Sequence, residues 1–495
     1  MPRPCKRRRI GAAPECRRFG PWPPRDGARS ILAMTLDEYE TVRLMDREGL
    51  TQAQCAERMA VARTTVQAIY AAARKKLARC LTDGAELWIC GGTYALCAGG
   101  ALTGEAAALI RRAAADGAEL IYGDAVQTGA DGRARPVFRP AWSPETLLSH
   151  NYAGSALVLA AELYARAGAD GREDADALYA LFHRAAALAD GACHIPRTLF
   201  CGAPPPPCCN CRIVSDALRR LGRSGTVGQG LFIGSFDVRY GVAGEPLVSV
   251  IVRSEGDADA VGRTLESFEQ RSAYRRFERI VADGTLPDAR TRAWYRALHE
   301  RRAATVVAHP GETNAARLVN EAARHARGDL LLFLDAGLTL GAHDALERLI
   351  EQVQQPGVAA AGGKVVDGAG RLVHAGLAFC PCAPGSEAPR ALFAGRWDAL
   401  TDRAQNLYAN CTRDVSAVSG ALLVGAQRFF SLGGFDETFA AAHLMAALCV
   451  RIAGVGGRVV YTPYARFIAA APSPPPPLPR CSRERCTDLF RPCLL

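Results

Sequence analysis

The sequence predicts an α/β protein in which an all-α module precedes an open sheet of parallel strands. Residues 330–334 form an unbroken apolar run that is too short for a helix and is typical of a strand buried on both faces. Residues 246–252 form a second such run, followed by a helix-like segment at 258–270 and a third strand-like run at 277–281. Closely spaced helix signals between residues 35 and 81 predict the N-terminal module.

Composition is that of a globular protein with a basic N-terminal part. The 495 residues are 49% hydrophobic and 22% charged, which excludes wholesale disorder and leaves room for roughly two to four domains. The net charge is +10, and residues 1–95 contribute most of it, with 17 Lys and Arg against 10 Asp and Glu. This asymmetry predicts a polyanionic partner for the N-terminal part only.

The 18 cysteines are scattered, and no apolar segment follows the Arg-rich N-terminus, so we expect no secretory signal, reduced thiols and a cytoplasmic location. Cys208, Cys209 and Cys211 have metal-like spacing but no second pair, which favours a loop over a zinc site. No run reaches the roughly 18–20 apolar residues of a membrane helix. The closest, residues 87–104, is broken by glycines and favours strands and turns.

Helix signals follow one another in the N-terminal part. Residues 1–30 are rich in Pro and Arg and are expected to form an extended arm. Thr35 is an N-cap residue with Glu38 as its capping-box partner, which predicts a first helix. A second helix is expected at 52–59 and, after a short turn, a third at 63–81.

Two helices of this size joined by a short turn are typical of a helix-turn-helix, whose second helix lies in the major groove of DNA. Bases or phosphates would then be contacted by the start of the third helix, through Arg63, Thr64, Thr65 and Gln67. Further along, phosphate contact or a solvated face is expected of Lys75, Lys76 and Arg79. The alternative is a three-helix structural module.

The segments MPRP, MTLDEYETVRLMDREGLTQAQCAERMAVARTTVQAIYAAARKKLA and LWICGG resemble a small uncharacterised helix-turn-helix family similar to region four of bacterial sigma factors. The resemblance covers residues 1–95 and implies contact with double-stranded DNA. Ala62 stands where that family usually has a serine, so one phosphate-binding hydroxyl is missing.

Carboxylates follow two of the predicted strands. Asp335 ends the run at 330–334, and Asp283 follows the run at 277–281. Open α/β sheets bind ligands outside the carboxyl ends of their strands, so these residues predict contact with a base, a ribose or a divalent cation. Loop or cap residues are the alternative.

Five motifs resemble the family 2 glycosyltransferases of cell-surface polysaccharide synthesis: PLVSVIV, SFEQRSAYRRFERIVADGT, NEAARHARGDLLLFLDAG, GRLVHAGLAF and VSAVSGALLVGAQRFFSLGGFDE. The resemblance covers residues 246–470. It implies a GT-A, Rossmann-like domain that transfers sugar from a nucleotide-diphosphate donor to a saccharide acceptor, with Mg²⁺ or Mn²⁺ as cofactor.

The resemblance assigns roles to residues and also shows losses. It makes Asp335 the remaining metal and donor ligand, since Gly337 stands where the metal-directed aspartate is usual. Ala282 replaces the aspartate that is usual at the other strand end, and Asp283 beside it is expected to contact the base or ribose of the donor. The acidic helix start of the family is replaced here by Met445 and Ala447, which cannot accept a proton.

The catalytic base would therefore have to be Asp436 or Glu437, and we expect impaired catalysis. The plainer alternatives are that Gly433 and Gly434 make a tight turn, that the following acids cap a helix, and that His374 is a satisfied polar residue.

The remaining segments are assigned by composition and resemblance. Residues 96–115 are expected to be a linker. Residues 116–240 resemble the acceptor-side half of another family 2 domain without its donor half, so we expect a truncated copy packed against the complete one. Residues 471–495 are rich in Pro and Cys and are expected to be disordered.

Two functions remain open. The first is a cytoplasmic glycosyltransferase, possessing a degenerate catalytic site and no transmembrane segment. The second is a DNA-binding transcriptional regulator with a pseudoenzyme C-terminal body.

Overall fold

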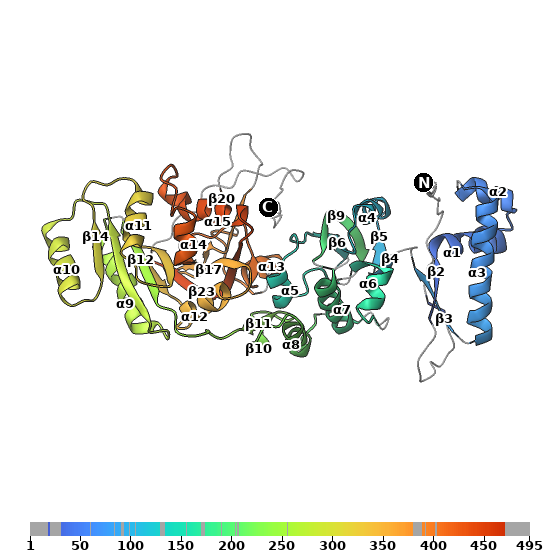
Figure 1. Ribbon diagram of the computed structural model, residues 1–495, viewed down its shortest axis with the longest axis horizontal. Coiled ribbons are helices and arrows are strands. Elements are labelled where there is room, and N and C mark those ends of the chain that lie inside the picture. Colours follow the sequence, from blue (N-terminus) through green and yellow to red (C-terminus); the bar gives the residue numbers. More distant parts are fainter. Residues whose placement is uncertain are drawn as a thin grey trace.

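The helices and strands of the computed structural model group into three units that follow one another along the chain (Figure 1). We call residues 18–19 and 31–90 the N-terminal module, 94–239 the middle unit and 248–470 the C-terminal unit. The structure describes residues 18–19, 31–59, 61–83, 85–90, 94–98, 100–103, 105–128, 134–154, 156–169, 174–189, 191–202, 204, 207–254, 256–379, 389–391, 393–400 and 403–470. Most of the expected arm at 1–30 and the whole of the expected tail at 471–495 lie outside these residues.

The N-terminal module combines helices with a small sheet, so the expectation of an all-α module was wrong. Strand β3 pairs in parallel with β2 and antiparallel with β1. The elements are β1 (Arg18–Phe19), β2 (Ile31–Thr35), α1 (Leu36–Val42), the π-helix η1 (Arg43–Arg47), α2 (Gln52–Met59), α3 (Arg63–Asp83) and β3 (Glu86–Cys90). Pairing of β2 with β3 joins segments about fifty residues apart, and no local pattern reveals such a contact.

The helix signals of this module are confirmed. Thr35 caps α1, and its capping box with Glu38 is present. The bounds of α2 match the expected 52–59, and Cys55 and Met59 are buried on its inner face. Helix α3 begins at the expected Arg63.

The C-terminal unit is built on one mixed sheet in the order β14-β13-β12-β15-β22-β17-β23-β16. Strands β14, β13, β12 and β15 are parallel neighbours in this order. The sequence predicted β12, β13 and β15 but not β14. The elements are β12 (Val248–Ser254), α9 (Ala258–Arg271), β13 (Phe277–Asp283), α10 (Ala289–Glu300), β14 (Thr305–Ala308), α11 (Ala315–Arg324), β15 (Leu330–Asp335), β16 (Leu338–Leu340), α12 (Ala345–Val353), β17 (Val358–Asp367), β18 (Leu372–His374), β19 (Leu377–Phe379), β20 (Pro389–Ala391), α13 (Arg403–Ala409), β21 (Arg413–Asp414), β22 (Ala421–Gly425), α14 (Ala426–Ser431), the 3-10 helix η2 (Ala441–His443), α15 (Leu444–Gly454) and β23 (Arg458–Ala469).

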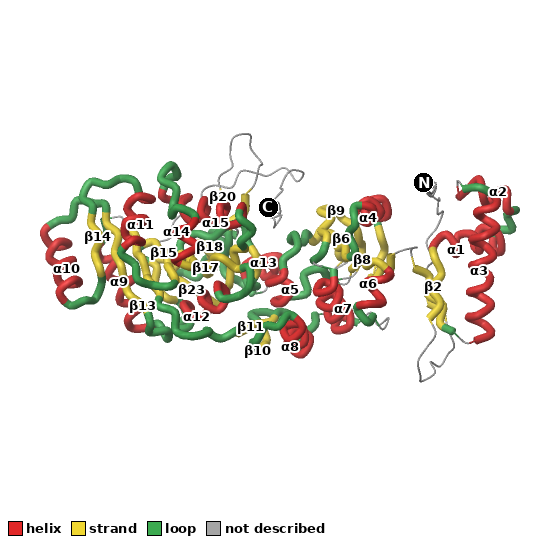
Figure 2. The backbone as a smooth tube through the Cα atoms, in the orientation of Figure 1, coloured by secondary structure: helices red, strands yellow, loops and turns green. Residues whose placement is uncertain are grey.

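Helices cover both faces of this sheet (Figure 2). One face packs against α11, α14 and α15, and the other packs against α9, α10 and α12. Successive residues of β15 therefore enter different cores: Leu331 and Phe333 face α11, whereas Leu332 and Leu334 face α9. Burial of both faces is the reason for the continuous apolar runs in the sequence.

Gly328 lies between helix α11 and strand β15, at a point where a side chain would not fit. Helix α11 already ends at Arg324, and His325 is its C-cap residue. A Cβ atom on Gly328 would lie 2.6 Å from both the backbone N and the Oγ of Ser249. Glycine is needed there because the chain passes close to the start of β12.

The middle unit has its own sheet in the order β4-β8-β6-β9-β5, with β7 paired to β6. Its elements are β4 (Tyr94–Ala98), β5 (Gly100–Leu102), α4 (Ala106–Ala115), β6 (Leu120–Thr128), β7 (Ala134–Val137), α5 (Pro144–Ser149), β8 (Ala156–Ala160), α6 (Ala161–Arg166), α7 (Ala175–Leu188), β9 (Cys193–Gly202), α8 (Cys211–Arg220), β10 (Thr226–Gln229) and β11 (Phe236–Arg239). The expectation of a linker at 96–115 was wrong, because these residues supply β5, α4 and the end of β4.

The two sheets share one pairing pattern. β4 pairs antiparallel with β8 as β15 does with β22, and β6 pairs in parallel with β9 as β17 does with β23. The antiparallel pairs β6·β8, β5·β9 and β6·β7 likewise match β17·β22, β16·β23 and β17·β18. Within its described residues the middle sheet has no counterpart of β12, β13 or β14.

A buried polar network joins the two units. Glu145 at the start of α5 is 1% exposed and accepts hydrogen bonds from Arg223 Nη1 at 2.9 Å and Arg458 Nη2 at 3.2 Å. Arg458 also donates to Asp414 Oδ1 at 2.8 Å, and Ser143 Oγ donates to Asp414 Oδ2 at 2.7 Å. The expected packing of residues 116–240 against the C-terminal unit is therefore present.

The described residues contain no helix long and apolar enough to cross a membrane. In the segment at 87–104, residues 87–90, 94–98 and 100–102 are in strands, as expected. The cysteines at 208–211 precede and begin α8, and the described part of the chain has no group of three or more His, Cys, Asp or Glu that could hold a metal ion.

Candidate functional site

Three parallel strands bring the predicted site residues to one edge of the C-terminal sheet. In the register of β12 with its neighbours, Arg253 lies opposite Asp335, and Ser254 lies opposite Asp283. Asp335 and Asp283 therefore lie at the same edge of the sheet. This placement follows from the parallel pairing of β13, β12 and β15.

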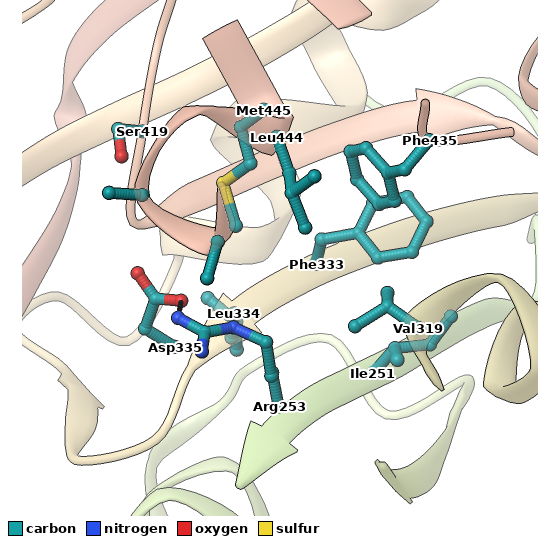
Figure 3. A pocket seen from close by; sticks show the side chains of 12 residues that line it. Ile251, Arg253, Val319, Phe333, Leu334, Asp335, Ser419, Phe435, Leu444 and Met445 are labelled. Carbon is teal, nitrogen blue, oxygen red and sulfur yellow. Dashed lines mark hydrogen bonds and ion pairs between the residues drawn. The ribbon is translucent and has the colours of Figure 1, made fainter. Parts of the chain in front are cut away.

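An ion pair occupies this edge. Arg253 Nη2 lies 2.7 Å from Asp335 Oδ1, and the two side chains approach one another in Figure 3. The Asp335 side chain is 39% exposed and the Arg253 side chain 15% exposed. Sequence reasoning missed Arg253, although a cation at the end of the apolar run 248–252 was a visible signal.

A small pocket of about 30 Å³ lies beside this ion pair. Its polar lining residues are Arg253, Asp335 and Ser419. Its other lining residues are apolar: Ile251, Val319, Phe333, Leu334, Phe435, Ala441, Ala442, Leu444 and Met445 (Figure 3). This volume is far below the roughly 300 Å³ of a small-molecule site, so a nucleotide would have to lie on the open rim of the pocket.

Met445 stands in the wall of this pocket, where the resemblance places an acidic residue. Ala447 is buried in the same helix, α15, and is not among the lining residues. Among the described lining residues, Asp335 is the only carboxylate, and it is paired with Arg253.

Asp283 is engaged within its own turn. Its side chain is buried, with 1% of the residue exposed, and accepts hydrogen bonds from Thr285 N at 2.8 Å and Thr285 Oγ1 at 2.7 Å. Tyr295 also donates to it. Burial and then this contact with Asp283 raise the pKa of Tyr295, which keeps the phenol a donor. The turn-capping role is the plainer of the two alternatives, and donor contact by Asp283 stays a prediction.

Asp436 and Glu437 lie outside the pocket lining. Asp436 Oδ1 accepts from Thr438 N at 2.9 Å and from Thr438 Oγ1 at 2.7 Å, and these hydrogen bonds lower the pKa of its carboxyl. Glu437 Oε2 lies 3.2 Å from Arg317 Nη2. Both carboxylates therefore have structural partners, and their role as a base stays a prediction.

The turn before these acids is fixed by backbone geometry. Gly433 and Gly434 have φ values of 80° and 76°, which favour glycine. Asn320 Oδ1 accepts from Phe435 N at 2.7 Å, and Asn320 Nδ2 donates to Phe435 O at 2.8 Å. The tight-turn alternative for the two glycines is confirmed.

His374 is neutral, but the alternative of a fully satisfied residue was wrong, because its buried Nδ1 has no hydrogen-bond partner among the described residues. Its Nε2 accepts from Ser419 N at 3.1 Å and from Gly376 N at 3.3 Å. Burial, with a smaller effect of Arg413, lowers the pKa of His374 to about 3. The contact with Ser419 positions one polar residue of the pocket.

The residues at this edge do not fit a divalent cation. Mg²⁺ and Mn²⁺ require several oxygen ligands, and Asp335 alone, already paired with a guanidinium, supplies one carboxylate.

In the N-terminal module the predicted DNA-contacting residues share the outer side of α3. Arg63, Thr64 and Gln67 are exposed and Thr65 is half-buried, whereas Val66 and Ile69 face the core. Further along, Lys75 is exposed, but Lys76 Nζ lies 2.7 Å from Glu38 Oε2 and is held within the module.

Comparisons with known proteins match both ends of the chain. The family model described as Glycosyl transferase family 2 matches residues 248–383, and the one described as Protein of unknown function DUF134 matches residues 1–97. The first match shows a family 2 glycosyltransferase domain at residues 248–383 of the C-terminal unit.

Different known proteins are similar to different parts of the chain. A UPF0251 protein of Desulfitobacterium hafniense strain Y51 is 56% identical over 99 residues, which cover 20% of this chain and 79% of that protein. Through its N-terminal part, the chain belongs to the UPF0251 family.

The O-antigen biosynthesis protein RfbC of Myxococcus xanthus is 29% identical over 374 residues, which cover 70% of this chain but only 28% of RfbC. Among solved structures, the mannosyltransferase PcManGT from Pyrobaculum calidifontis in complex with GDP-Man and Mn²⁺ aligns with 47% of this chain and 59% of its own, at 19% identity and a TM-score of 0.34.

Proposed function

We propose that the chain is a glycosyltransferase that takes a nucleotide-diphosphate sugar and a saccharide acceptor, and that its transfer step is impaired. The family 2 match to the C-terminal unit supports the class. The observation that carries the proposal is the meeting of Asp335, Arg253 and Asp283 at one carboxyl edge of the sheet. The name of RfbC supports a place in cell-surface polysaccharide synthesis.

The impairment follows from the chemistry of sugar transfer. The acceptor hydroxyl needs a general base within hydrogen-bond reach. Met445 in the pocket wall cannot take a proton, and Asp335 is paired with Arg253. Asp436 and Glu437 are the acidic residues nearest to Met445 in the sequence. Asp436 accepts a hydrogen bond from Thr438, and Glu437 forms an ion pair with Arg317.

Donor binding can be tested by calorimetric titration of the full chain with uridine and guanosine diphosphate. Saturable binding that disappears when Arg253 and Asp335 are both replaced by alanine would support the proposal. A double variant of the exposed pair Arg324 and Glu321 is the matched control and should bind like the parent. Absence of binding to either nucleotide would refute donor binding.

We also propose that the middle unit is a truncated copy of the glycosyltransferase fold. The shared strand order and pairing support this, as does the lack of counterparts of β12 to β14. The sequence of residues 94–102 contains no acidic residue, whereas β15 ends in Asp335. The copy would therefore support the C-terminal unit through the Glu145 network and would not bind a donor.

A second candidate function is binding of double-stranded DNA by the N-terminal module, as in a transcriptional regulator with an inert C-terminal body. The favouring observation is that Arg63, Thr64 and Gln67 are exposed together on the outer side of α3. A salt-dependent mobility shift that is lost in Arg63→Ala and kept in Arg111→Ala, an exposed arginine of α4, would support it. Equal loss in both variants, or no shift at low salt, would count against it.

A further inference from the structure

The edge of the sheet already contains a cation that belongs to the protein. The guanidinium of Arg253 lies at the end of β12, within 2.7 Å of the carboxylate that ends β15. Parallel pairing fixes this position, because Arg253 and Asp335 are register partners. The carboxylate is the more exposed of the two groups, so the pair borders on solvent.

This guanidinium would oppose a bound metal ion. A dication at Asp335 would lie within a few ångström of a permanent positive charge, where like charges repel even at a protein surface. It would also find only one carboxylate in the pocket lining. Arg253 therefore competes with the expected Mg²⁺ or Mn²⁺ for Asp335, the single carboxylate ligand.

We propose that Arg253 replaces the divalent cation and binds the diphosphate of a nucleoside diphosphate directly, without metal. This inference rests on the proposed function. A divalent cation bound by two carboxylates has no net charge, and a guanidinium paired with one carboxylate has none either. The guanidinium has five N–H donors in a planar fork that matches phosphate oxygens, and Asp335 orients this fork at the strand end.

The shape of the site places the diphosphate on the open rim. The enclosed space of about 30 Å³ is too small for it and is walled by Met445 and Leu444. Asp335 lines this pocket and its side chain is 39% exposed, so a ligand can reach the ion pair from solvent. Asp335 is thus a positioning residue for Arg253 and not a metal ligand.

The test is calorimetric titration of the full chain with uridine and guanosine diphosphate, in EDTA and in Mn²⁺. We expect binding in EDTA, with a Kd that Mn²⁺ changes by no more than about twofold. Arg253→Gln should weaken binding by at least about tenfold, since a charged hydrogen-bond donor is lost. Arg253→Lys should keep part of the affinity, and Asp335→Asn should keep binding in EDTA.

Arg279→Gln is the matched control, because Arg279 lies on β13 and pairs with Glu269 at 2.8 Å, away from the pocket lining. Thermal unfolding of each variant would show that it is folded. Binding that requires Mn²⁺ and is lost in Asp335→Asn would overturn the inference but leave the proposed function intact. No binding under either condition would overturn both.

Discussion

The joint between the middle and C-terminal units depends on a carboxylate that is almost fully buried. Glu145 receives hydrogen bonds from Arg223 of the middle unit and Arg458 of the C-terminal unit. We predict that Glu145→Ala lowers the free energy of unfolding by about 3 kcal/mol, the lower end for breaking a buried ion pair, because Arg458 keeps Asp414 as a partner. Arg223, 12% exposed, would be left without its carboxylate.

Urea unfolding followed by circular dichroism measures this effect, and thermal unfolding should show a fall of roughly 4 °C if the two units unfold together. Arg324→Gln is the control, since it removes only an exposed ion pair with Glu321 and should cost no more than about 0.5 kcal/mol. If Glu145→Ala and the control unfold at the same urea concentration, the network does not hold the units together.

Three further predictions concern pH, catalysis and packing. Burial lowers the pKa of His374 to about 3, from 6.5. The unfolded chain therefore binds a proton that the folded chain excludes. The free energy of unfolding should fall as pH drops from about 6.5 toward 3, by up to about 1.4 kcal/mol per pH unit for this group, and His374→Gln should flatten that part of the profile; an unchanged slope would contradict this. Release of nucleoside diphosphate from a panel of nucleotide sugars should stay at background, and a higher rate abolished by Asp436→Ala or Glu437→Ala would identify the missing base. Gly328→Ala should destabilise the C-terminal unit by about 1–3 kcal/mol, because its Cβ would lie 2.6 Å from the backbone N of Ser249; an unchanged urea midpoint would show that the chain shifts at no cost.

Local patterns predicted the elements that are determined locally. The apolar run at 330–334 gave β15, and the capping box at Thr35 gave the start of α1. The prediction of a linker at 96–115 was wrong because β5 is short and contains glycine, and because its partner β9 lies about one hundred residues away in the sequence. Strand β2 of the N-terminal module escaped prediction because its partner β3 also lies far away in the sequence.

The candidate site was predicted in part. Asp335 lines the pocket, but its partner Arg253 is 82 residues distant in sequence and becomes a neighbour only through the parallel register of β12 and β15. The replacement of an acid by Met445 was visible in the sequence, and its place in the pocket wall was not. The hydrogen bonds that engage Asp436 also depend on the folded turn.

The most direct test of nucleoside diphosphate binding at the carboxyl edge of β12, β13 and β15 is photo-crosslinking with azido-uridine or azido-guanosine diphosphate, followed by peptide mapping. We expect label on the peptides that contain Arg253, Asp283 and Asp335, and we expect unlabelled nucleotide to displace it. Label confined to the middle unit or the N-terminal module, or label that unlabelled nucleotide does not displace, would contradict a donor site at this edge.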